Sequence, residues 1–130
     1  MALLSAGRIA AAFGATAIAT TALLSAPVAA QAAVTCNATY AQLDLPSRSA
    51  GWTVVCDGTA TIYVDAQVWY ESTQELVTLP GAGAHVVQAG QTWNVWTQDS
   101  THTGAADHGV VHIVKDNGNG PATPLAHVFQ

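Results

Sequence analysis

The sequence predicts an all-β protein: a small antiparallel β-sandwich or Greek-key barrel of six to seven strands with one disulfide. Residues 59–70 alternate almost strictly between apolar residues and mostly polar ones. Shorter alternating runs, separated by turn residues, occupy other parts of the chain. After residue 32 no segment repeats apolar residues at helical spacing. Half of the 130 residues are hydrophobic and 8% are charged, which excludes intrinsic disorder. The net charge of -5 excludes a basic, nucleic-acid-binding surface.

Residues 1–32 have the layout of a cleaved signal peptide. Arg8 is their only charged residue, an apolar stretch follows over 9–24, and Ala30-Gln31-Ala32 fits a small-residue cleavage motif. We expect cleavage before Ala33, which leaves one secreted domain of residues 33–130. The alternative is a retained membrane anchor, but the stretch is rich in Ala, Thr and Gly, as in a bacterial leader. The domain then has two basic residues, Arg48 and Lys115, and eight carboxylates, so it is acidic.

Both cysteines, Cys36 and Cys56, lie in the predicted secreted domain. Because the space outside the cytoplasm oxidises thiols, we expect an intrachain disulfide between them. A loop of about 20 residues closed in this way adds roughly 3 kcal/mol to the free energy of unfolding. A free or metal-bound pair is the alternative, although the chain has no CxxC spacing.

Short segments separated by turns have the composition of strands, and we expect six or seven of them to form. The longest, Thr59–Tyr70, places Ile62, Val64 and Val68 on one face and Tyr63, Asp65 and Trp69 on the other. Asp57-Gly58 separates it from an earlier alternating run and predicts a type I′ hairpin. The other candidate strands are Val34–Tyr40, Trp52–Cys56, Leu76–Leu79, His85–Gln88, Thr92–Gln98, Val110–Lys115 and, as a last short one, Leu125–Phe129.

One short segment collects groups that could bind a metal or catalyse hydrolysis. It contains Asp99, His102, Asp107, His108 and His112. Imidazole and carboxylate groups are zinc and copper ligands, so a small metal-dependent hydrolase using the Asp99–His112 loop is one hypothesis. The chain has neither a spaced zinc motif nor a GxSxG elbow. We therefore expect no catalytic residue, no metal site and no cofactor.

Three aromatic residues are the candidate binding residues. Tyr63 and Trp69 lie on the polar face of the long strand, and Trp96 is out of phase with Trp93 and Val95. Exposed rings on a rigid sheet anchor protein partners or stack on sugars. The alternative is that the second sheet or the loop over 99–109 covers them.

The predicted domain also resembles the tendamistat-type α-amylase inhibitors, which are small secreted bacterial β-sandwiches of six strands. Cys36 and Cys56 match the first disulfide of that family, Tyr40 follows at the family's spacing, and residues 85–91 resemble its strand before a Pro-Gly-Gln turn. The resemblance implies that Gly109–Val114 is the last family strand. The second disulfide has no cysteines here, and Leu43-Asp44-Leu45 replaces the inhibitory Trp-Arg-Tyr triplet, with Arg48 the only basic residue nearby.

Together these patterns favour a small secreted, non-enzymatic protein that binds a secreted protein or a glycan through a β-sheet surface. Inhibitor-like action towards a secreted glycosidase is one form of this hypothesis. A carbohydrate- or cell-wall-associated module is the main alternative, and the small hydrolase is a further one. We expect no nucleic-acid partner and, after cleavage, no membrane partner.

Overall fold

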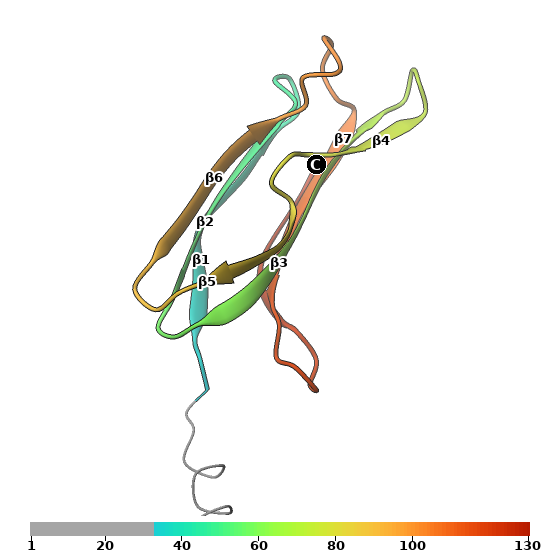
Figure 1. The fold of residues 1–130 in the computed structure, drawn as a ribbon. Helices are drawn as coiled ribbons and strands as arrows, with labels where there is room; N and C mark the ends of the chain where they lie inside the picture. The colour runs from blue at the N-terminus through green and yellow to red at the C-terminus, as the bar shows by residue number, and fades with distance from the viewer. Residues whose placement is uncertain (1–32) are drawn as a thin grey trace, which may run out of the picture. The chain divides into compact units, whose positions relative to one another are not determined.

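In the computed structural model, which describes residues 33–130, two antiparallel β-sheets pack face to face around an apolar core (Figure 1). The predicted signal peptide, residues 1–32, lies outside the described residues. Within 33–130 the chain forms strands, turns and loops and no helix. These residues thus contain no helix of the length and apolarity that crossing a membrane requires.

The smaller sheet has three strands in the order β1-β2-β6. Its strands are β1 (Cys36–Asp44), β2 (Ser49–Cys56) and β6 (Thr92–Gln98). A register shift between Ala38 and Tyr40 changes the alternation of β1, so that Tyr40 is exposed while Leu43 is buried.

The larger sheet is built around β3, which pairs with β7 on one side and with both β4 and β5 on the other. Its strands are β3 (Ala60–Tyr70), β4 (Glu75–Thr78), β5 (Gly83–Val87), β7 (His108–Lys115) and β8 (Thr123–Phe129). The predicted count of six to seven strands is therefore wrong, since the described residues form eight. A break at Pro80, which has no N–H for the ladder, divides one edge of the sheet into β4 and β5.

The alternation predicted for residues 59–70 is confirmed. Every second residue of β3, from Ala60 to Tyr70, is buried, whereas Tyr63 and Asp65 are exposed. From the other sheet, Trp52 is fully buried and meets the half-buried Trp93 edge-on, with ring centroids 5.8 Å apart. The two inner faces thus fill the space between the sheets, and the opposite faces are left to solvent.

The predicted hairpin at Asp57-Gly58 is wrong. The strands on its two sides do not pair, because β2 belongs to the three-stranded sheet and β3 to the five-stranded sheet. Gly58 does not have the positive φ of a type I′ turn. A Cβ at Gly58 would lie 2.8 Å from Val34 Cγ2, so this glycine permits close packing where the chain crosses between the sheets.

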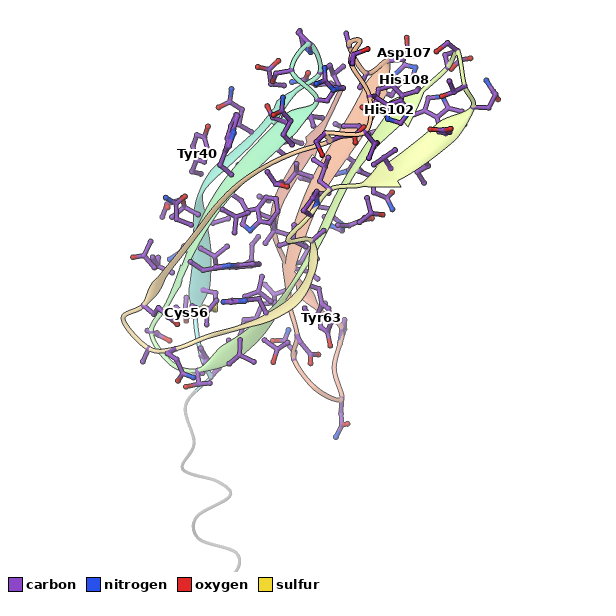
Figure 2. The ribbon with its side chains drawn as sticks, turned by 45° about the horizontal axis from the view of Figure 1, so that its top comes forward. Tyr40, Cys56, Tyr63, His102, Asp107 and His108 are labelled. Atoms are coloured by element: carbon purple, nitrogen blue, oxygen red, sulfur yellow. A yellow bond between two sulfur atoms is a disulfide. The ribbon has the colours of Figure 1, made fainter. Side chains whose placement is uncertain are left out.

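The predicted disulfide between Cys36 and Cys56 is confirmed. The two residues lie directly opposite each other in the β1–β2 register, and both are buried. The bond therefore joins the open end of the first hairpin, at the opposite end of the sandwich from His102 (Figure 2).

Removing this bond tests its contribution to stability. Cys36→Ala/Cys56→Ala should lower the free energy of unfolding by about 3 kcal/mol, because the unfolded chain regains the freedom of the closed loop. For a domain of this size the thermal midpoint should fall by roughly 10 °C or more. Calorimetry of both proteins provides the measurement, and midpoints within about 2 °C of each other would contradict a stabilising role.

Candidate binding surface

The outer face of the three-stranded sheet carries aromatic, amide and hydroxyl side chains. Trp52 and Val54 of β2 point into the core. The alternate residues of β2, Gly51, Thr53 and Val55, therefore point outward, as do the residues opposite them on β1 and β6. The side chains in the middle of this face are those of Asn37, Tyr40, Gln42, Thr53, Val55, Thr92, Asn94 and Trp96. None of these is charged, whereas Asp44, opposite Ser49, continues the face at the turn between β1 and β2. We call the uncharged residues, together with Gly51, the amide-aromatic face.

Two rings of this face lie over the backbone of Gly51. Gly51 is directly opposite Trp96 in the β2–β6 register, and a Cβ at Gly51 would lie 2.9 Å from Trp96 Cε3 and 3.2 Å from Tyr40 Cε1. These contacts bury Gly51, yet Trp96 remains 63% exposed and Tyr40 43% exposed. The indole of Trp96 thus rests on the sheet at the glycine, as aromatic side chains do opposite glycine in antiparallel pairs, and leaves much of its surface in solvent.

Hydrogen bonds orient the polar groups around these rings. The Tyr40 hydroxyl donates to Gln42 Oε1, and the Thr53 hydroxyl donates to Asn94 Oδ1 over 3.0 Å. Both amide oxygens are therefore engaged. The amide nitrogens of Gln42 and Asn94 remain as donors at the surface: Gln42 is the β1 partner of Gly51, and Asn94 is the outward position of β6 next to Trp96.

The other two candidate residues lie on a different face. Tyr63 and Trp69 point outward from β3 in the five-stranded sheet, so Figure 2 shows Tyr40 and Tyr63 on opposite sides of the sandwich. Tyr63 is 45% exposed, whereas Trp69 is half-buried and donates its indole N–H to Glu71 over 2.9 Å. Six residues on one strand span about 20 Å. The structure therefore does not bring Tyr63, Trp69 and Trp96 into one site.

The loop between β6 and β7 contains a buried carboxylate. Asp99 is 2% exposed and accepts hydrogen bonds from the Tyr70 hydroxyl at 2.6 Å, the Thr101 N–H at 2.8 Å and His102 Nδ1 at 2.7 Å. His102 Nε2 lies 2.7 Å from Glu75 Oε2, and the imidazole stacks on the Tyr70 ring with centroids 3.8 Å apart. This network joins the loop to β3 and β4.

These contacts shift two pKa values in opposite directions. Burial alone would raise the pKa of Asp99, but hydrogen bonds from Thr101, Tyr70 and His102 outweigh it and hold this pKa well below its usual range. Burial raises the pKa of Tyr70, and its hydrogen bond to the Asp99 carboxylate raises it further. The pair is therefore a tyrosine hydroxyl donating to a carboxylate across the neutral pH range.

Several of the residues considered for a hydrolase in the Asp99–His112 loop already have partners within the protein. Both ring nitrogens of His102 contact carboxylates, so neither is available to take a proton from a substrate. The Asp107 carboxylate instead accepts from the Glu71 N–H at 2.8 Å, and His112 lies beside His127 on the outer face of the five-stranded sheet. Within 33–130 no three His, Cys, Asp or Glu side chains group as metal ligands.

Sequence patterns did not identify four residues of these arrangements. Tyr40 and Gly51 contribute to the amide-aromatic face, and Tyr70 and Glu75 to the network around Asp99. Tyr40 and Gly51 meet through strand register, which is not readable from one sequence, and Tyr70 and Glu75 meet Asp99 and His102 of the loop after β6 only through the packing of the two sheets. Gly51 stands just before the predicted strand Trp52–Cys56, whereas β2 begins at Ser49 and therefore includes it.

Comparison with protein-family models found no match to the chain, and comparison with curated proteins found none either. The resemblance to the tendamistat-type inhibitors therefore rests on the residues quoted above.

Asp99→Asn tests the network. Asparagine cannot accept from Tyr70 and His102 as the carboxylate does, so the free energy of unfolding at pH 7 should fall by about 2 kcal/mol or more. Because the pKa of Asp99 is lowered by folding, its stabilisation is complete above the ordinary aspartate pKa of about 4 and is lost as the pH falls below it. The wild type should lose more stability than Asp99→Asn between pH 7 and pH 2.

Urea unfolding at a series of pH values measures both effects. Asp65→Asn, an exposed carboxylate on β3, is the matched control and should follow the wild-type curve. Parallel curves for the wild type and Asp99→Asn would contradict this account of the network.

Proposed function

We propose that this protein is an exported binding protein without enzymatic activity, and that it holds its partner on the amide-aromatic face. The observation that carries the proposal is the indole of Trp96, which rests on Gly51 and is 63% exposed. A large ring already fixed by the sheet loses little conformational freedom on binding, and tryptophan is enriched among residues that dominate binding energy.

The geometry favours this face over the outer face of the five-stranded sheet. Tyr40 and Trp96 both contact the position of Gly51, so two rings and two amide donors belong to one continuous surface. Tyr63 and Trp69 are separated along β3, and the indole N–H of Trp69 already has an acceptor. A single partner gains more from the clustered rings.

Inhibition of a secreted glycosidase through the β1–β2 turn has less support. Leu43 stands where the tendamistat-type inhibitors have the first residue of their inhibitory triplet, and it is buried. The Arg48 guanidinium donates to the carbonyl oxygens of Asp99, Thr103 and Gly104, each at 3.2 Å. Neither side chain is free to enter an enzyme's active site, so we assign binding to the sheet and not to the turn.

Export is supported by the leader-like residues 1–32 and by the Cys36–Cys56 bond, which is typical of an oxidising compartment. Intact-mass measurement of protein recovered from the culture medium should give a chain that begins at Ala33, two hydrogens lighter than the reduced form. Recovery only from the membrane, with residues 1–32 retained, would contradict export and cleavage.

Three variants test the binding face, with the protein immobilised and exposed to native culture medium. Trp96→Ala removes the exposed ring, and Gly51→Ala keeps the ring but places a Cβ where it now rests. Both should weaken retention of the partner, Trp96→Ala by about 2 kcal/mol. Trp69→Ala, on the other sheet, is the matched control and should retain it.

Near-UV circular dichroism and the urea midpoint confirm that each variant is folded. Normal retention by folded Trp96→Ala and Gly51→Ala, combined with loss in Trp69→Ala, would show that the partner binds elsewhere.

A further inference from the structure

We infer that the ligand of the amide-aromatic face is a neutral glycan chain of β-linked pyranose rings; this rests on the proposed function. Three properties of the face carry the inference: the absence of charge, the rings at Gly51 and the placement of the amide donors. Each restricts the chemistry of a ligand that the face can accommodate.

The lack of charge on this face contrasts with the acidic domain around it. Without residues 1–32, the domain has two basic residues, Arg48 and Lys115, against eight carboxylates, yet none of the residues of the face is charged. The nearest charged side chain on its strands is Asp44, the next outward position of β1 after Gln42, which accepts from the Ser47 N–H at 3.5 Å. An anionic ligand would lose hydration here without gaining an ionic partner, so a neutral ligand fits better than an acidic one.

The exposed indole selects the shape of that ligand. A pyranose ring with equatorial hydroxyls presents only C–H groups above and below its plane, so it can lie on an aromatic ring without burying a polar group. Its hydroxyls then project sideways, where side-chain amides can donate to them. Trp96 supplies the ring, and Gln42 and Asn94 supply amide donors beside it.

The spacing of these groups favours an extended chain. Asn94 and Trp96 are successive outward positions of β6, about 7 Å apart along the strand, and Gln42 lies two strands from Trp96, about 10 Å away across the sheet. A chain that crosses the strands over Trp96 can therefore reach Gln42 with a neighbouring sugar, while the sugar stacked on Trp96 reaches Asn94 with a hydroxyl at its side. Equatorial β-linkages keep a glycan straight and ribbon-like, as an open sheet face requires, whereas α-linkages curve the chain away from it.

The experiment is a depletion assay with the protein produced from its full sequence and recovered from the medium. The probes are insoluble cellulose and chitin, which are neutral and β-linked, starch granules, which are neutral and α-linked, and cross-linked pectate, which is acidic. We expect saturable binding to cellulose, chitin or both, little dependence on salt, and at least tenfold weaker binding to starch and pectate. Folded Trp96→Ala should bind at least about tenfold more weakly, and Trp69→Ala normally.

Other outcomes overturn specific parts of the inference. Preference for starch overturns the β-linkage, and salt-sensitive binding to pectate overturns neutrality. Failure to bind any polysaccharide overturns the ligand class but leaves the proposed function standing if a protein from the medium is retained in a Trp96-dependent manner. Polysaccharide binding that survives Trp96→Ala and Gly51→Ala overturns the assignment to this face. Gly51→Ala displaces the Trp96 ring without removing it, so it tests whether binding needs the position of the ring as well as its presence.

Discussion

The hydrogen bonds of the buried Asp99 carboxylate hold the two sheets together at one end of the sandwich. The chain leaves the three-stranded sheet at this residue, and the carboxylate binds Tyr70 of the five-stranded sheet. Its backbone N–H donates to the Arg48 carbonyl at 2.9 Å, although Arg48 has a φ of 57°, which is uncommon for a residue other than glycine. The first hairpin, the crossing loop and β3 are therefore held together by one residue, through its backbone and its carboxylate, whereas the Cys36–Cys56 bond joins β1 to β2 at the opposite end.

This anchoring leaves the middle of the three-stranded sheet free for another role. Its inner face is committed to the core through Trp52 and Val54, but its outer face need only remain soluble, which polar residues achieve without tryptophan. Gly51 costs the strand some stability, because it has no side chain to pack. Trp96 covers it and remains largely exposed. The two features are best explained together: Gly51 leaves room for the indole of Trp96 to lie on the sheet, and the exposed indole is the surface on which a ligand stacks.

Local patterns predicted most of the elements and little of their assembly. Alternation located most of the strands and the inner face of β3, because it depends on nearby residues, and the disulfide was predictable because two cysteines allow only one intrachain pairing. The Asp57-Gly58 hairpin failed because tertiary pairing, not the dipeptide, decides which strands meet. The three candidate aromatics were correctly phased as outward, yet phase does not say that Trp96 belongs to a different sheet from Tyr63 and Trp69. Tyr40 lies in the site because of the register of β1 on β2 and the irregularity between Ala38 and Tyr40, neither of which local alternation predicts.

The central claim is that binding occurs on the amide-aromatic face, and chemical-shift mapping with a soluble β-linked oligosaccharide tests it most directly. The claim predicts that titration moves the Trp96 indole N–H, the Gly51 amide and the side-chain amides of Gln42 and Asn94, with saturation at one affinity. Signals of Tyr63, Trp69 and His102 should stay in place. Shifts confined to those three residues, with Trp96 and Gly51 unchanged, would contradict the account.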